Sequence, residues 1–282
     1  MNGGEYAIGV WSLKLDQQHP FYLRFCAAAL FSTAIAVLFA GCGQQGGSKE
    51  ATVETPAKPS GPVLTLDPST VGSISGTVKI EGNLKQITGI ISPCAKGAAA
   101  GAPPPPPTEA KAEPANIVIY LKSGLGNYHF DTPTNPVPLD QKNCTYQPHA
   151  LALMVNQPLE IENSDPVAHN IHVLSKINPQ WNHSEPPGVA PIMESFSKPE
   201  LAVHVICKLH PGMSAFVFVF DNPYYAVTSS SGTFDLKGVP PGTYTVEAWQ
   251  QQLGTQDQVV TIAPKESKTL SFVFKSGGSS GD

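Results

Sequence analysis

Alternation of apolar and polar side chains predicts many short β-strands. Residues 73–80 (SISGTVKI) alternate as a half-buried strand does, and residues 116–121 (NIVIYL) form a second apolar run. Between residues 146 and 222, short apolar runs such as 216–220 (FVFVF) alternate with turn residues. After Pro223, Ser-Gly, Pro-Gly and Pro-Lys pairs separate further expected strands. Because no segment has the period of a long amphipathic helix, the pattern predicts an all-β fold of the sandwich type.

Two segments lack this alternation and are expected to be loops. Residues 42–70 are rich in Gly, Ser, Pro, Lys and Glu, which is typical of a flexible tether. Residues 101–115 contain a run of prolines, which favours an extended, solvated loop. The chain has 28 Pro and 25 Gly but only 14% charged residues, as a loop-rich β protein does. A net charge of −5 without a basic stripe argues against nucleic acid as a partner.

An uncharged segment near the N-terminus leads directly to a cysteine. Residues 25–41 (FCAAALFSTAIAVLFAG) follow Arg24 and are too few for a comfortable membrane span. The small residues before Cys42 resemble the lipobox of bacterial lipoproteins, although Phe39 stands where that family usually has Leu. The resemblance implies a signal peptide over 1–41, a lipid on Cys42, and an extracytoplasmic protein held at a bacterial membrane, periplasmic or outer. An uncleaved anchor and a signal peptide without lipid are the alternatives.

The expected location outside the cytosol changes how the cysteines are interpreted. With Cys26 removed in the signal peptide and Cys42 lipidated, Cys94, Cys144 and Cys207 remain in an oxidising compartment, and an odd number leaves one thiol without a partner. The economical assignment pairs Cys94 with Cys144 in a disulfide and leaves Cys207 as a thiolate. A bound metal ion would protect such a thiolate.

The C-terminal part of the chain resembles a known small β-domain. Residues 229–248 (SSSGTFDLKGVPPGTYTVEA) and 258–274 (QVVTIAPKESKTLSFVF) resemble the second half of a carboxypeptidase regulatory-like domain. The first half of that family typically opens with a strand like SISGTVKIEG, and NIVIYLKSG also fits. Far more sequence separates the two halves than a loop of that domain needs, so an insertion is expected between them.

The insertion resembles a cupredoxin, that is, a blue copper domain. Residues 146–173 (YQPHALALMVNQPLEIENSDPVAHNIHV) resemble the first half of plastocyanin- and amicyanin-type proteins, and residues 207–213 (CKLHPGM) have the C-x-x-H-x-x-M spacing of amicyanin. The resemblances imply a Greek-key cupredoxin sandwich inserted in, or packed against, a small regulatory-like β-sandwich. The expected parts are a signal peptide (1–41), a tether (42–70), two halves of the regulatory-like domain (71–127 and 223–277), a copper domain (128–222) and a disordered tail (278–282).

The cupredoxin resemblance implies one copper ion held by four side chains, which are His169, Cys207, His210 and Met213. Soft sulfur ligands suit Cu(I), imidazoles suit both oxidation states, and a thiolate with two imidazoles and a weak axial thioether is the blue-copper ligand set. Taken singly, each has a plainer explanation: a buried core cysteine, a packed methionine or a histidine in a surface loop. Their combination in this order favours the metal site.

Neighbouring polar residues are given lesser roles. His172 is an odd number of positions from His169 and is expected on the opposite face of a strand. The cupredoxin resemblance implies that Asn170 hydrogen-bonds across to the cysteine loop. Asn163, Ser164 and Asp165 are interpreted as turn residues rather than site residues.

Such a ligand set leaves no open equatorial position and therefore favours one-electron transfer over catalysis. The chain is expected to be an electron carrier rather than an enzyme, with extracytoplasmic redox proteins as partners at the exposed edge of His210. A copper oxidase or nitrite reductase needs a second set of histidines, which the eight histidines of this chain do not form. A dinuclear copper centre needs two cysteines in one loop, and only Cys207 is present there. Both classes are therefore disfavoured. The alternative is a non-catalytic lipoprotein that binds carbohydrate or protein, with a subordinate or vestigial copper site. In that alternative Tyr244 and Trp249 stack on a sugar, although a structural role in the core is favoured for both.

Overall fold

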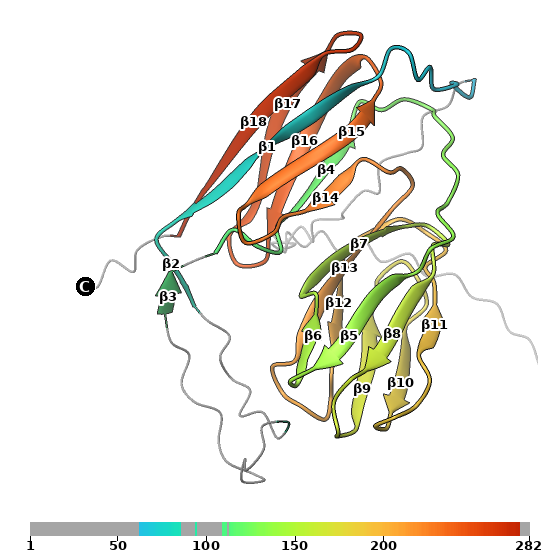
Figure 1. Cartoon of the computed structure of the whole chain (residues 1–282), viewed down its shortest axis with the longest axis vertical. Helices are drawn as coiled ribbons and strands as arrows, with labels where there is room; N and C mark the ends of the chain where they lie inside the picture. The colour runs from blue at the N-terminus through green and yellow to red at the C-terminus, as the bar shows by residue number, and fades with distance from the viewer. Residues whose placement is uncertain (1–61, 86–93, 95–108, 112, 277–282) are drawn as a thin grey trace, which may run out of the picture. The chain divides into compact units, whose positions relative to one another are not determined.

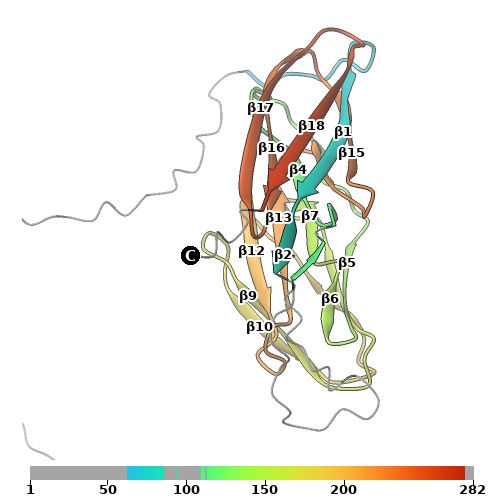
Figure 2. The same ribbon diagram turned by 90° about the vertical axis from the view of Figure 1, so that its left-hand side faces the viewer.

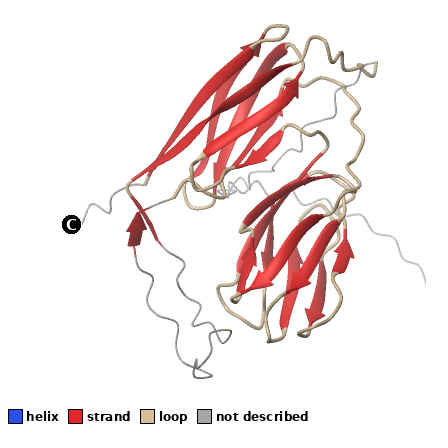
Figure 3. Cartoon of the chain, viewed as in Figure 1, coloured by secondary structure: helices blue, strands red, loops and turns tan. Residues whose placement is uncertain are grey.

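The computed structural model describes residues 62–85, 94, 109–111 and 113–276. The expected signal peptide, Cys42, most of the tether, most of the proline-rich loop and the tail lie outside these residues. The described part consists of eighteen β-strands joined by loops, which confirms the all-β prediction (Figure 3). Among the described residues no helix is long and apolar enough to cross a membrane.

A first sandwich combines strands from both ends of the described chain. Its sheets have the orders β15-β1-β18 and β14-β4-β16-β17. We call this the enclosing sandwich, and Figures 1 and 2 show β1 between β15 and β18. Its strands are β1 (Gly72–Glu81), β4 (Val118–Ser123), β14 (Tyr225–Val227), β15 (Thr233–Val239), β16 (Gly242–Gln250), β17 (Gly254–Ile262) and β18 (Ser267–Lys275).

The alternation in β1 explains how this sandwich forms. Ile74 and Val78 point into a core that contains Phe272 and Phe274 of β18. Gly76 lies between Ile74 and Val78 on β1, where both neighbouring strands come close to its backbone. A Cβ at this position would come 2.1 Å from the carbonyl oxygen of Leu270 on β18. The glycine inside SISGTV is therefore required by the close backbone approach.

A second sandwich, which we call the inserted sandwich, lies between β4 and β14 in the sequence. Its sheets have the orders β10-β9-β12-β13-β7 and β11-β8-β5-β6 (Figure 1). Its strands are β5 (Val137–Lys142), β6 (Thr145–Gln147), β7 (Ala150–Met154), β8 (Leu159–Asn163), β9 (His169–Leu174), β10 (Trp181–Glu185), β11 (Ile192–Glu194), β12 (Glu200–Ile206) and β13 (Ser214–Phe220). The domain boundaries expected from the sequence remain a prediction.

A short pair of strands, β2 (Asn83–Lys85) and β3 (Glu109–Lys111), corrects one expectation. The second of them falls within residues 101–115, which were expected to form a loop throughout. The alternation that identifies longer strands cannot be recognised in three residues.

Both faces of β13 are buried, which explains its uninterrupted apolar sequence. Val217 and Val219 belong to the core of the inserted sandwich. Phe218 and Phe220 point the other way and form a cluster with Val118 and Tyr120 of β4, and the Trp249 ring centroid lies 4.9 Å from that of Phe218. The strand that leaves the predicted copper loop is therefore packed into two cores.

We expect Phe218→Ala to lower the free energy of unfolding by about 3–5 kcal/mol, because it leaves a cavity in the cluster between β13 and β4. Val259→Ala is the control, since Val259 is 72% exposed, and it should cost less than about 1 kcal/mol. Denaturant unfolding followed by circular dichroism measures both. Similar values for the two variants would contradict this account of β13.

Candidate metal centre

The loop between β12 and β13 holds three of the four expected ligands. Cys207 directly follows β12 and Met213 directly precedes β13. The Cys207 N–H donates to the Met213 carbonyl oxygen at 3.0 Å, and the Met213 N–H donates to the His210 carbonyl oxygen at 3.1 Å. Gly212 has a φ of 89°, which favours glycine and lets the loop turn within a few residues. Continuation of the strand ladder into the loop thus fixes its shape.

The fourth expected ligand comes from β9, which pairs with β12. His169 Nδ1 lies 2.8 Å from His210 Nδ1 and 4.0 Å from the Cys207 sulfur. The His210 Nδ1 lies 3.6 Å from the same sulfur. His169 and Cys207 are 0% and 4% exposed, and His210 is partly exposed. The structure thus gathers two imidazole nitrogens and a thiol around one buried point.

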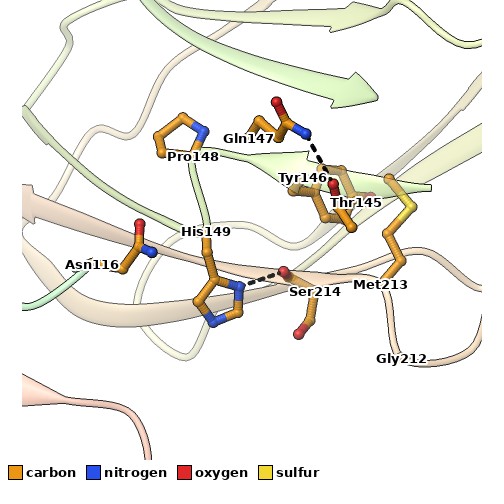
Figure 4. A pocket seen from close by; sticks show the side chains of 9 residues that line it. All are labelled: Asn116, Thr145, Tyr146, Gln147, Pro148, His149, Gly212, Met213 and Ser214. Carbon is orange, nitrogen blue, oxygen red and sulfur yellow. Dashed lines mark hydrogen bonds between the residues drawn. The ribbon is translucent and has the colours of Figure 1, made fainter. Parts of the chain in front are cut away.

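Met213 is 1% exposed and belongs to the same buried cluster as Cys207. Its backbone is fixed by the two hydrogen bonds that close the loop. Figure 4 shows its side chain at the edge of a hollow of about 390 Å³, which lies beside the loop. The hollow is lined by Asn116, Thr145, Tyr146, Gln147, Pro148, His149, Gly212, Met213 and Ser214. His169, Cys207 and His210 do not line it, so the hollow is separate from the point where these three converge.

The surroundings of Cys207 favour the thiolate that a metal ligand needs. Burial raises the pKa of the Cys207 thiol, but the contact with the His169 imidazole and hydrogen bonds from the backbone N–H groups of Asn170, Leu209 and His210 outweigh it. The pKa of Cys207 therefore lies below its ordinary value. Burial also lowers the pKa of His210, which favours the neutral imidazole that binds metals.

Asn170 connects β9 to the cysteine loop. Its Oδ1 accepts the Lys208 N–H at 2.5 Å, and its Nδ2 donates to Asn182 on β10. This is the contact across to the loop that the sequence suggested for Asn170. It ties the strand that carries His169 to the residue after Cys207.

Asp165 contacts the site although sequence reasoning assigned it to a turn. Its Oδ2 lies 2.8 Å from His169 Nε2, the ring nitrogen that faces away from Cys207. Burial raises the pKa of Asp165, but hydrogen bonds from Cys144, His169 and Asn143 hold it below its ordinary value, so the group is a carboxylate. The only sequence signal was an acidic residue four positions before a histidine at the start of an expected strand.

Cys94 and Cys144 form a disulfide, and Cys207 is a free, buried cysteine. The Cys94 sulfur lies 3.2 Å from Asp165 Oδ2 and 3.9 Å from His169 Nε2. A disulfide sulfur has no proton to donate and is not a thiolate, so these are packing contacts. The group formed by these cysteines with Asp165 and His169 is therefore no metal site while the disulfide is intact.

Two other histidines near the site are held elsewhere. The side chain of His204 stacks on Phe216, with ring centroids 5.0 Å apart. His149 lies between the Ser214 carbonyl oxygen at 3.0 Å and Gln251 Oε1 at 2.6 Å. Neither belongs to the group formed by His169, Cys207 and His210.

Residues 210–275 match the family model of the carboxypeptidase regulatory-like domain. This confirms the resemblance of the C-terminal part to that family. The matched range begins within the loop of the candidate metal centre and includes β13, which pairs with strands of the inserted sandwich.

Two solved structures of copper proteins are similar to this chain. A copper-containing nitrite reductase from Thermus scotoductus is 17% identical, and the similarity covers 52% of this chain and 28% of that chain with a TM-score of 0.29. A mutant of amicyanin with Cu(I) is 16% identical, and the similarity covers 37% of this chain and 99% of that chain with a TM-score of 0.27. No curated protein matches the sequence. The case for a copper centre therefore depends on the residues of this chain.

A second buried carboxyl lies next to the site. Glu185 is fully buried, and it lies opposite His169 in the register of the neighbouring strands β10 and β9. Gln141 Nε2 donates to Glu185 Oε2, while Oε1 of each of these two residues is buried without a partner among the described residues. Burial raises the pKa of Glu185 and so favours its protonated form. The carboxyl proton then supplies a hydrogen-bond donor between Glu185 Oε1 and Gln141 Oε1.

We expect the wild type to lose free energy of unfolding as the pH rises, and Glu185→Gln to lack this loss. Because the folded-state pKa of Glu185 is raised, its contribution is complete below about pH 4.5 and is lost as the pH rises through the folded-state pKa. The copper-free wild type should therefore lose stability relative to the variant from pH 4.5 upward. Denaturant unfolding at a series of pH values measures this difference. The other carboxyls are common to both proteins, so equal pH dependence would show that Glu185 has no raised pKa.

Proposed function

We propose that this chain is a copper protein that carries single electrons outside the cytoplasm. The observation that supports it most is the convergence of His169 Nδ1, His210 Nδ1 and the Cys207 sulfur at one buried point. Their donor set of one thiolate and two imidazoles suits copper in both oxidation states. Met213, in the same loop, would supply a thioether as the fourth ligand.

In the proposed centre, copper supplies a one-electron change between Cu(I) and Cu(II). The protein contributes a ligand set whose shape is fixed before the metal binds. Backbone hydrogen bonds between Cys207, His210 and Met213 hold the loop, and Asn170 holds the loop to β9. Burial of Cys207 and His169 keeps water from these two ligands. A rigid, largely buried ligand set supports electron transfer rather than substrate chemistry.

Electrons would enter and leave near His210, the ligand that is partly exposed. Leu209 beside it is 55% exposed, so an apolar side chain adjoins the imidazole at the surface. A weakly docking extracytoplasmic redox protein is the proposed partner at this place.

Attachment to a bacterial membrane through a lipid on Cys42 is part of the proposal. The uncharged residues 25–41 before that cysteine support it. The disulfide Cys94–Cys144 adds support, because disulfides form and persist outside the reducing cytosol.

The alternative of a sugar-binding lipoprotein is weakened by the two aromatic residues on which it depended. Tyr244 is 2% exposed, and its hydroxyl donates to the Pro240 carbonyl oxygen. The ring of Trp249 packs against Phe216 and Phe218, with ring centroids 5.1 and 4.9 Å apart. Both side chains are engaged within the protein.

We expect the full chain to bind one Cu(II) and to become intensely coloured through thiolate-to-copper charge transfer. The colour should bleach on one-electron reduction and return on reoxidation. Cys207→Ser should abolish it, because the thiolate is the donor of the transition. Visible absorption spectroscopy measures all three results.

The control is His172→Gln, because His172 is outside the group formed by His169, Cys207 and His210. This variant should keep the full colour of the wild type. Copper binding without colour in the wild type, or equal loss of colour in the control, would contradict the proposed centre.

A further inference from the structure

The second ring nitrogen of His169 is bound to a carboxylate. Nδ1 faces Cys207 and His210, whereas Nε2 lies 2.8 Å from Asp165 Oδ2. We propose that Asp165 is a positioning residue of the metal centre. It fixes the tautomer and orientation of His169, adds a negative charge behind it, and is itself held by the turn that carries Cys144 of the Cys94–Cys144 disulfide. The inference deepens the proposed function and depends on it for the identity of the metal.

The tautomer follows from the chemistry of the pair. A carboxylate can only accept hydrogen bonds, so the 2.8 Å contact requires the proton of a neutral His169 ring on Nε2. Nδ1 then keeps its lone pair, and that atom faces the Cys207 sulfur. Because the His169 side chain is 0% exposed, water cannot replace Asp165 as the acceptor. The lone pair is thus directed at the metal position before any metal binds.

Asp165 is held by a hairpin turn from a distant part of the sequence. The Asn143 N–H donates to its Oδ1 at 2.8 Å, and the Cys144 N–H donates to its Oδ2 at 2.9 Å. Asn143 and Cys144 both have a φ of 55°, which is typical of a type I′ turn between two antiparallel strands, here β5 and β6. In this turn both N–H groups point at the same carboxylate and bind it as an anion.

The disulfide joins this turn to the site. Residues other than Gly, Asn and Asp rarely adopt a positive φ, and Cys144 does so with its side chain bonded to Cys94. The Cys94 sulfur also covers the Asp165–His169 contact, at 3.2 Å from the carboxylate oxygen and 3.9 Å from the imidazole nitrogen. The disulfide, the turn, the carboxylate and the imidazole therefore form one continuous series of contacts that ends at the metal position.

The negative charge of Asp165 should strengthen metal binding by His169, which packing contacts alone would not do. A carboxylate that accepts the imidazole proton makes the other nitrogen a stronger ligand, and removal of such a partner typically costs about 10–100-fold in metal affinity. Cu(II) carries one more positive charge than Cu(I), so loss of the carboxylate should weaken Cu(II) more than Cu(I).

The test compares Asp165→Asn with Glu194→Gln in the full chain. Glu194 Oε1 lies 2.7 Å from Nε2 of His183, so the control removes the charge from an equivalent carboxylate–imidazole contact away from the metal centre. Affinities for Cu(I) and Cu(II) are measured by competition with chelators. Asp165→Asn should lower Cu(II) affinity about 10–100-fold and Cu(I) affinity less. Glu194→Gln should change neither.

A measurement on metal-free protein separates this inference from the proposed function. Nitrogen-15 NMR at alkaline pH, where the ring is neutral, reports which nitrogen of His169 carries the proton. We expect Nε2–H in the wild type and a mixture of tautomers in Asp165→Leu, which cannot accept a hydrogen bond. If Asp165→Leu does not fold, the same measurement on Asp165→Asn is expected to show a smaller loss of Nε2–H.

The disulfide is tested with the double variant Cys94→Ser/Cys144→Ser. Its Cu(II) affinity should fall in the same direction as that of Asp165→Asn, because the turn no longer holds the carboxylate. The inference is overturned if His169 is Nδ1–H in the wild type, if Asp165→Asn leaves both copper affinities unchanged, or if Glu194→Gln changes them equally. A wild type that binds no copper but has Nε2–H at His169 would reject the proposed function and keep the role of Asp165 in orienting the ring.

Discussion

The pairing of β12 with β9 on one side and β13 on the other is the constraint on which the candidate metal centre depends. Through its pairing with β13, β12 closes the loop that carries Cys207, His210 and Met213. Through its pairing with β9, it brings His169 beside that loop from 38 positions earlier in the chain. A change of register by one residue in either pairing would turn each side chain to the opposite face of the sheet. The ladder therefore fixes both which residues meet and which of their atoms face one another.

Stability and site geometry are linked through β13. One face of this strand packs into the inserted sandwich and the other into the cluster with β4 and Trp249. The strand cannot move without disturbing two sets of buried side chains, and close-packed interiors resist such movement. The loop that precedes β13 is thereby anchored at its C-terminal end, while Asn170 anchors it near Cys207. A site anchored in this way allows only small changes in the positions of its ligands.

The sequence predicted those parts of the site that are local or that repeat a known spacing. The loop ligands lie within seven residues, and His169 was identified because it precedes an expected strand in a recognisable motif. Asp165 was assigned only to a turn, since Asn163, Ser164 and Asp165 together are typical of one, and Asp165 does accompany Asn163 in such a turn. Its contact with His169 depends on donors from Asn143 and Cys144, which only the folded hairpin brings near. For Tyr244 and Trp249 the sequence favoured a role in the core over a sugar site, and Tyr244 is buried while Trp249 is partly buried against Phe216 and Phe218.

The nested order of the two sandwiches determines which strands are synthesised first and how much chain must close at the end. β1 lies beside β18 in parallel, and the hydroxyl of Ser73 donates to that of Ser267, 194 residues later. During synthesis, every strand of the inserted sandwich emerges before β18 does. In the folded chain β4 and β14, which flank the inserted sandwich, pair with each other, so the two ends of that sandwich lie close together. If the insertion folds first, the length of chain that must close to bring β1 to β18 becomes shorter, and the entropy lost in this closure becomes smaller. An insertion that folds first thereby lowers the entropic cost of completing the domain that surrounds it.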